Sequence, residues 1–144
     1  MPEITSAAII DALLAIVGAK GVLHGEDDTA GFLSDWHNRY HGEAYAVVLP
    51  ETTDQVAAIM AYADKNNIIV VPQGGNTGFM GGATPDDTGH SIVLSLKRMN
   101  KIREIDSQNM SMTVEAGCVL QNLQDRADDA GLYFPLNLAA KGSC

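Results

Sequence analysis

The sequence predicts an α/β (α+β) fold in which a parallel βαβ subdomain is followed by an incomplete antiparallel subdomain. Two short apolar runs, 46–49 and 68–71, flank a segment of helical periodicity, which is the pattern of a βαβ unit with parallel strands. Two later segments, 102–106 and 110–115, alternate apolar and polar residues across a short turn, as antiparallel hairpins do. A single hairpin leaves its edges uncovered, so we expect the antiparallel sheet to be incomplete.

The start of the chain is predicted to hold one helix followed by irregular structure. Apolar residues at helical spacing predict a helix over 6–17, with Thr5 as its N-cap and Gly18 as its stop. Residues 20–42 have weak periodicity and scattered Gly and Asp. We expect them to be irregular, apart from a short helix near 33–36.

The middle and end of the chain are predicted to hold two further helices and a third parallel strand. A capping-box pattern at Thr52 precedes apolar residues at i, i+3, i+4 and i+7, which predicts a helix over 53–66. The two apolar runs that flank it are predicted to be buried strands, and 91–96 is predicted to be the third strand. After the hairpin, a helix over 118–130 is expected to stop at Gly131.

The strongest functional signal is the glycine loop, residues 72–83. Five of the chain's fourteen glycines lie between Gly74 and Gly82, directly after an apolar strand. Such glycines let successive backbone N–H groups point inward and form a nest for a phosphate or pyrophosphate. No two of these glycines are separated by one residue and no lysine follows them, so neither the dinucleotide fingerprint nor the P-loop is present. We therefore expect loop backbone to bind a diphosphate; a run of tight turns without a ligand is the alternative.

Composition narrows the range of partners. The chain of 144 residues has a formal net charge of −9 and no basic stripe, so we expect no nucleic-acid partner. Its start carries no positively charged leader and no uninterrupted apolar stretch, so we expect neither a signal peptide nor a membrane span. Two cysteines are too few for a disulfide framework, which favours a reducing compartment and hence a cytoplasmic location.

Four motifs in register over 44–144 together resemble one family. They are Pro72-Gln-Gly-Gly-Asn-Thr-Gly78 with Gly81-Gly82, Leu96-x-x-Met-Asn-Lys-Ile102, Thr113-Val-Glu-Ala-Gly117 and Phe134-Pro-Leu-Asn-Leu-Ala-Ala-Lys-Gly-Ser-Cys144. In this combination the chain resembles the FAD-linked oxidases and dehydrogenases of the vanillyl-alcohol oxidase/p-cresol methylhydroxylase type. Within that family it is most similar to the D-lactate and D-2-hydroxyglutarate dehydrogenase branch.

The resemblance implies a p-cresol methylhydroxylase-type FAD-binding domain over 44–144, truncated at its C-terminal end and preceded by the lead-in 1–43. It implies non-covalent FAD, because Asn76 stands where some relatives carry a histidine that attaches the cofactor. The cofactor contacts that it implies come from the glycine loop and the C-terminal motif: Pro72, Gly74, Gly75, Asn76, Thr77, Gly78, Gly81, Gly82, Pro135, Gly142, Ser143 and Cys144.

The resemblance also implies an activity, namely oxidation of a 2-hydroxy acid of the D-lactate or D-2-hydroxyglutarate type by hydride transfer to FAD. In the family a separate substrate domain carries the acid/base and metal-binding groups. We therefore name no catalytic or metal-binding residue, and we expect the chain to be an N-terminal fragment that is inactive alone. A stand-alone FAD- or nucleotide-binding module without catalysis is the alternative, and an interaction domain with an empty glycine loop is a third hypothesis.

A few single residues allow two interpretations. His37 and His41 have the spacing of a helical metal pair but no adjacent Glu, so we expect a solvated or hydrogen-bonded pair. Trp36 and Tyr40 could touch the cofactor or cover the core, and we expect them to cover the core. Cys118 could be a reactive thiol at a helix N-terminus, but we expect a small core residue.

Overall fold

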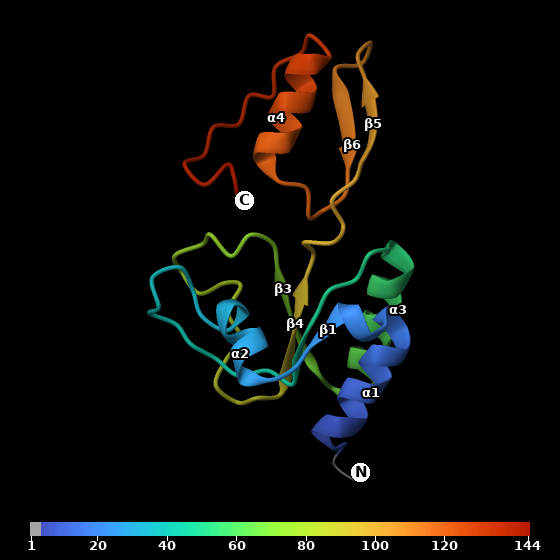
Figure 1. Ribbon diagram of the computed structural model, residues 1–144, viewed down its shortest axis with the longest axis vertical. Helices are drawn as coiled ribbons and strands as arrows, with labels where there is room; N and C mark the ends of the chain where they lie inside the picture. The colour runs from blue at the N-terminus through green and yellow to red at the C-terminus, as the bar shows by residue number, and fades with distance from the viewer. Residues whose placement is uncertain (1–3) are drawn as a thin grey trace.

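The computed structural model describes residues 4–144, which form two lobes (Figure 1). The α/β lobe, residues 4–96, contains a four-stranded sheet, and the hairpin lobe, residues 102–144, contains a two-stranded sheet with one helix. The C-terminal segment returns from the hairpin lobe towards the α/β lobe (Figure 1). These lobes are the predicted parallel and antiparallel subdomains, so the predicted fold class is confirmed.

The elements follow one another with short connections over most of the chain. In chain order they are α1 (Ser6–Val17), the 3-10 helix η1 (Ala19–Gly21), β1 (Val22–Leu23), α2 (Glu26–Thr29), the 3-10 helix η2 (Ala30–Phe32), β2 (Ala46–Val48), α3 (Thr53–Asn66), β3 (Ile69–Gln73), β4 (Ser91–Ser95), β5 (Ile102–Asp106), β6 (Ser111–Val114) and α4 (Leu120–Asp129). Within residues 4–144, no helix is long and apolar enough to cross a membrane.

The larger sheet has the strand order β1-β2-β4-β3. Strands β2 and β3 both run parallel to β4, which lies between them, and β1 is antiparallel to β2. Every residue of β2 and β4 is buried. By contrast β3 is an edge strand, and Ile69 in it is 49% exposed. The expectation that 68–71 is buried is therefore wrong, because an apolar run does not reveal a strand's position within the sheet.

Helices α1 and α3 lie side by side and pack their apolar faces on the sheet (Figure 1). Both have the predicted bounds and the predicted N-caps. The Thr5 hydroxyl accepts the N–H of Ala8 at 3.3 Å, and the Thr52 hydroxyl accepts the N–H of Gln55 at 3.2 Å. Burial of the apolar stripes against β2 and β4 then forms the core, whose most enclosed side chains include Ile9, Leu13, Ile59 and Ile92.

Residues 20–42 of the lead-in are more ordered than the sequence suggests. Strand β1 pairs with β2, and α2 and η2 follow it. Segment 33–36 is not helical, so that prediction is wrong. Asp35, which is 3% exposed, accepts N–H groups from Arg39 at 2.6 Å and from Tyr40 at 3.0 Å. These bonds close a compact loop in place of a helical turn, and the N–H of Tyr40 is the main cause of a lowered pKa at Asp35.

The hairpin lobe has an antiparallel β5–β6 pair with an irregularity between Ile102 and Glu104. Helix α4 buries one side, Leu120, Leu123 and Ala127. The helix is shorter than predicted at both ends, although Gly131 follows it with φ +71° as expected of a stop. The predicted strand bounds are confirmed to within one residue.

The connection 96–101 is fixed to the hairpin lobe by backbone contacts. The N–H of Gly117 donates to the carbonyl of Met99 at 2.8 Å, and a Cβ at Gly117 would collide with the connection's backbone. The buried carboxylate of Glu115 accepts the N–H of Lys101 at 2.9 Å and the guanidinium of Arg103 at 3.3 Å. The bond from Lys101 is the larger cause of a lowered pKa at Glu115. These contacts fix the path of the connection as it enters the hairpin lobe.

Candidate functional site

The glycine loop leaves β3 at the sheet's carboxyl edge and carries a row of free donors. Within residues 4–144, none of the N–H groups from Gly74 to Ala83 donates to a protein acceptor. Backbone N–H groups without protein partners must bond to water or to a ligand. A neutral row of such donors suits a phosphate or diphosphate, because hydrogen bonds to an ionised acceptor are the stronger kind.

Two side-chain amides hold the glycine loop against the lead-in. The amide of Gln73, which is 2% exposed, donates to the carbonyl of Phe32 at 2.9 Å and to that of Ala83 at 2.8 Å. The amide of Asn76 donates to the carbonyl of Ser34 at 2.8 Å, with the backbone in the left-handed region at φ +54°. The loop is therefore shaped by side chains from its own ends, which leaves its N–H groups free.

The C-terminal motif folds back onto the glycine loop. A Cβ at Gly75 would lie 1.7 Å from the carbonyl oxygen of Ser143, so only glycine permits this approach. The motif is itself held by α4, since the carbonyl of Cys144 accepts the N–H of Leu120 at 2.8 Å. Two motifs that lie about half the chain apart in sequence thus meet at one point.

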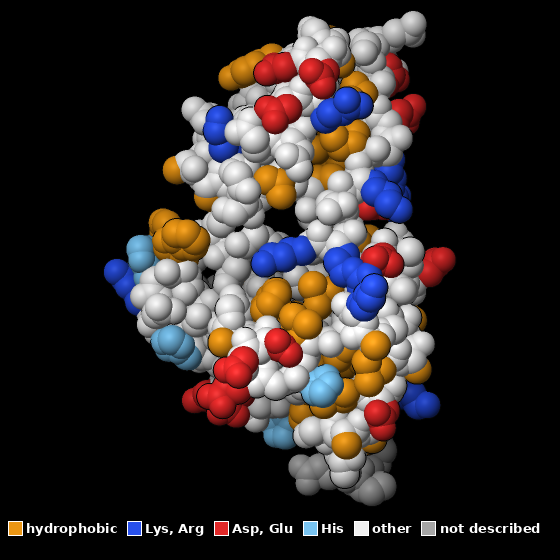
Figure 2. Space-filling view, in the orientation of Figure 1, with side chains coloured by type: hydrophobic (Ala, Val, Ile, Leu, Met, Phe, Trp, Pro, Cys, Tyr) orange, Lys and Arg blue, Asp and Glu red, His pale blue; other side chains and the backbone are white. Residues whose placement is uncertain are grey.

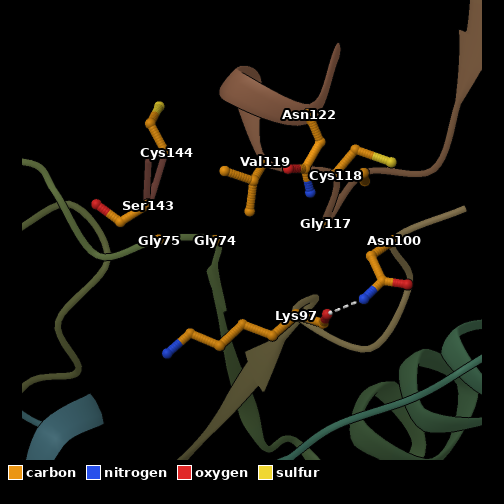
Figure 3. Close-up of a pocket in the computed structure, with 11 residues that line it drawn as sticks. Gly74, Gly75, Lys97, Asn100, Gly117, Cys118, Val119, Asn122, Ser143 and Cys144 are labelled. Atoms are coloured by element: carbon orange, nitrogen blue, oxygen red, sulfur yellow. Dashed lines mark hydrogen bonds between the residues drawn. The ribbon is translucent and has the colours of Figure 1, made fainter. Parts of the chain in front are cut away.

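The first of two cavities at this point, the junction cavity, lies between the lobes and has a volume of about 330 Å³. Gly74 and Gly75 form one wall, Cys118 comes from the segment just before α4, and Asn122 comes from the first turn of α4 (Figure 3). Lys97 runs beneath the two glycines in this view. Among the described residues that line the cavity, Lys97 is the only one with a charged side chain. The cavity therefore combines free N–H donors with one positive charge.

Lysine and arginine side chains gather where the lobes meet (Figure 2). Lys97, Arg98 and Lys101 all belong to the connection between them. Arg98 is engaged by an ion pair with Glu51 and a hydrogen bond to the carbonyl of Leu49. The ammonium of Lys97 instead lies 4.8 Å from the centre of the Phe32 ring, a weaker contact that leaves its charge open to an anion.

The second cavity, the aromatic cavity, has a volume of about 460 Å³ and also borders Ser143. Trp36, Phe79 and Thr77 form one wall, and the C-terminal motif forms the rest. Trp36 is 64% exposed and Phe79 is 54% exposed. The expectation that Trp36 and Tyr40 cover the core is therefore wrong. The loop closed by Asp35 carries both rings away from the core, and the Tyr40 ring lies against the backbone of Gly81 instead.

The structure brings half of the predicted site residues, six of twelve, to the two cavities. The junction cavity is lined by the predicted residues Gly74, Gly75, Ser143 and Cys144, and the aromatic cavity by Thr77, Gly142 and Ser143. Asn76 and Gly81 have the contacts described above but line neither cavity. Four more predicted residues line neither cavity, and all four are exposed: Pro72, Gly78, Gly82 and Pro135.

Sequence reasoning missed Lys97, Asn100 and Asn122 in the junction cavity, and Phe79 in the aromatic one. A signal for Lys97 was present. It follows a predicted strand, as the glycine loop follows another, and the carboxyl ends of parallel strands meet at one edge. The register pairs Gln73 with Ser95, which places Lys97 beside the loop.

The remaining single-residue expectations concern the pair His37 and His41, and Cys118. His41 contacts the carbonyl of Asn38 at 2.9 Å, and the ring of His37 lies 4.6 Å from that of Phe79. Within residues 4–144, no three His, Cys, Asp or Glu side chains gather around a point that could hold a metal ion. Cys118 is half-buried and lines the junction cavity, so the expectation of a core residue is wrong.

Comparison with known proteins agrees with this geometry. A family model described as "FAD binding domain" matches residues 44–144. A rice protein (Oryza sativa subsp. indica) named as a probable mitochondrial D-2-hydroxyglutarate dehydrogenase is 41% identical over 130 residues, which are 90% of this chain and 23% of that protein. A Schizosaccharomyces pombe protein whose name suggests a mitochondrial D-lactate dehydrogenase is 37% identical over 142 residues, covering 94% of this chain and 27% of that protein.

Among solved structures, p-cresol methylhydroxylase with bound substrate is similar, with a TM-score of 0.75 and 26% identity over 93% of this chain and 26% of the other. The chain therefore belongs to the family of FAD-binding domains found in flavin-dependent oxidoreductases of the p-cresol methylhydroxylase type. FAD is accordingly its cofactor, and the free N–H groups of the glycine loop are a donor set that fits a dinucleotide.

The same comparisons show how much of its relatives' length the chain spans, and they test the predicted cellular compartment. The chain spans about a quarter of the length of these relatives. The cytoplasmic location expected from cysteine usage is contradicted, because the rice and fission-yeast relatives are named as mitochondrial. A low cysteine count argues only against an oxidising compartment and cannot distinguish one reducing compartment from another.

Proposed function

We propose that this chain is the FAD-binding part of an oxidoreductase that oxidises a 2-hydroxy acid of the D-2-hydroxyglutarate or D-lactate type. The names of the rice and fission-yeast relatives support the substrate class. The observation that carries the cofactor role is the row of free N–H groups from Gly74 to Ala83, packed through Gly75 against Ser143.

In this proposal the FAD diphosphate binds to the N–H groups of the first half of the loop, from Gly74 to Gly78. Gly81 and Gly82 close the far end of the loop. Pro135 and Gly142–Cys144 approach the cofactor from the other side. FAD is held without a covalent bond, because the amide of Asn76 is not a nucleophile and is engaged with Ser34.

In the proposed reaction, FAD and the residues of this chain have different roles. When bound, FAD supplies a ring that accepts a hydride from the carbon bearing the substrate's hydroxyl. The residues of this chain bind and orient the cofactor and exclude water from the diphosphate. We assign no acid, base or metal ligand among them, and we propose that the chain does not turn over substrate by itself.

Titration of the purified chain with FAD, followed by flavin fluorescence, tests the cofactor role. FAD is expected to bind saturably and much more tightly than FMN, which lacks the diphosphate linkage and the adenosine. A Gly75→Asp variant is expected to lose this binding, because its Cβ collides with Ser143 and its charge repels the diphosphate.

The matched control is Gly31→Asp, which adds the same charge where a Cβ meets nothing within 4 Å. Equal loss of binding in the two variants would argue against a site at Gly75, and absence of FAD binding by the unaltered chain would contradict the cofactor role.

The substrate class is tested on the full-length protein that contains this chain. D-2-hydroxyglutarate or D-lactate is expected to bleach the flavin's visible absorption, and the matching L-acids are the controls. Tight FAD binding without reduction by either D-acid would favour the alternative, a binding module without catalysis.

A further inference from the structure

We propose that Trp36 and Phe79 form a stacking wall that receives the isoalloxazine ring of FAD in the aromatic cavity. The inference rests on the proposed function, since it takes the diphosphate to lie on the glycine loop. It extends that function by assigning a ring-binding role to two aromatic residues outside the diphosphate-binding segment.

The arrangement of the two cavities supports this placement. Ser143 borders both of them, and Thr77 of the glycine loop lines the aromatic one. A dinucleotide with its diphosphate on the loop N–H groups extends away from them in two directions. In this placement one of its rings extends towards the aromatic cavity.

The two aromatic side chains are exposed, and contacts hold the Trp36 loop and the Phe79 ring. A cluster of large, exposed apolar side chains commonly marks a ligand site. The loop that carries Trp36 is closed by the buried Asp35 through two backbone N–H groups. On the other side, the His37 ring lies against Phe79 with its centroid 4.6 Å away. Aromatic groups positioned in this way suit the face of a planar ring.

The chemistry of the cavity favours isoalloxazine over adenine. Beyond the aromatic pair, the wall consists of Ala139, Ala140 and Gly142, and its polar side chains are the hydroxyls of Thr77 and Ser143. The benzenoid end of isoalloxazine carries only methyl groups and needs no hydrogen bonds. The edge of adenine carries an amino group and several ring nitrogens, more hydrogen-bonding groups than the two hydroxyl side chains of this wall can satisfy. Isoalloxazine, with three fused rings, also suits the larger of the two cavities.

The experiment uses FAD and ADP-ribose, which shares the adenine and diphosphate but has no isoalloxazine. Trp36→Ala is expected to raise the Kd for FAD about tenfold, in line with the loss of one stacking contact. Trp36→Phe keeps a ring and is expected to restore most of the affinity. ADP-ribose is expected to bind both variants as it binds the unaltered chain. The flavin absorption band is expected to change shape in Trp36→Ala and not in Trp36→Phe.

Two features make the test decisive. Trp36 is 64% exposed and is the chain's only tryptophan, so its replacement should not unfold the protein, and its fluorescence reports on ligand binding at this position. Far-UV circular dichroism and thermal melting check the fold of each variant. The matched control is Tyr133→Ala, which removes another strongly exposed aromatic group in the hairpin lobe and is expected to change nothing.

Unchanged FAD affinity in Trp36→Ala overturns the inference and leaves the proposed function intact. Equal weakening of FAD and ADP-ribose overturns the assignment to isoalloxazine, because it places adenine at this wall. Failure of the unaltered chain to bind either ligand contradicts the proposed function and therefore also this inference.

Discussion

Two loops of this molecule use their backbone N–H groups in opposite ways. In the β5–β6 turn, the carboxylate of Asp106 accepts the N–H groups of Gln108 and Asn109, both at 3.0 Å, and the Asn109 amide at 2.7 Å. In the glycine loop, the N–H groups from Gly74 to Ala83 have no acceptor among the described residues. A turn that only reverses the chain satisfies its own donors, whereas a loop that binds an anion keeps them free and needs another source of rigidity.

We expect the amide of Gln73 to be the main source of that rigidity and its loss to have the largest effect. Gln73→Leu leaves the carbonyls of Phe32 and Ala83 without their donor at a buried site. We expect a loss of about 3 kcal/mol in the free energy of unfolding, from two buried acceptors losing partners. Chemical denaturation measures it. Gln124→Leu removes an exposed amide bond to Leu136 and should cost far less; equal losses would argue against a special role for Gln73.

Asn76 provides a more selective test of the same idea. Asn76→Ala removes the bond to Ser34 and places alanine in the left-handed region, so we expect about tenfold weaker FAD binding as the loop loses its shape. Asn67→Ala is the control, because Asn67 has nearly the same φ, +53°, at the end of α3. It should destabilise the fold without changing FAD affinity. If titration shows both variants binding FAD equally well, the Asn76 amide does not shape the site.

The positive charge of Lys97 is expected to make a smaller contribution. Lys97→Gln should weaken FAD binding about threefold at low salt, and the difference should shrink as salt screens the charge. Lys101→Gln removes a neighbouring exposed charge outside the junction cavity. Calorimetric titration at several salt concentrations compares the two variants. A response of the same size in Lys101→Gln would mean that only the general charge of the protein matters.

The β5–β6 turn is predicted to respond to pH and not to the cofactor. The N–H of Asn109 is the main cause of the lowered pKa of Asp106, below its ordinary value of 3.8. The carboxylate therefore stabilises the fold above that value, and the stabilisation disappears as the pH falls through the lower, folded-state pKa. Asp106→Asn should be less stable at neutral pH, with the difference closing in acid. Thermal melting against pH measures this, and FAD affinity should not change.

Local patterns predicted part of this structure and non-local pairing determined the rest. The bounds of α1 and α3 follow from the caps Thr5 and Thr52 and from apolar periodicity within each segment. The exposure of β3 and the existence of the two-residue β1 depend on strand order, which no local pattern contains. The glycine loop was recognisable because its glycines are contiguous. Lys97 had only the indirect signal of following a predicted strand, and Trp36 was expected to cover the core, because the β3–β4 pairing and the Asp35 loop that bring them to the site are not local patterns.

The central claim is that the free N–H groups of the glycine loop bind the FAD diphosphate, and amide resonances recorded by NMR during a titration with FAD test it most directly. We predict that the amides from Gly74 to Gly78 shift and become protected from hydrogen exchange when FAD binds, while those of Gln108 and Asn109 do not change. Saturable FAD binding that leaves the loop amides unshifted and unprotected would contradict the claim.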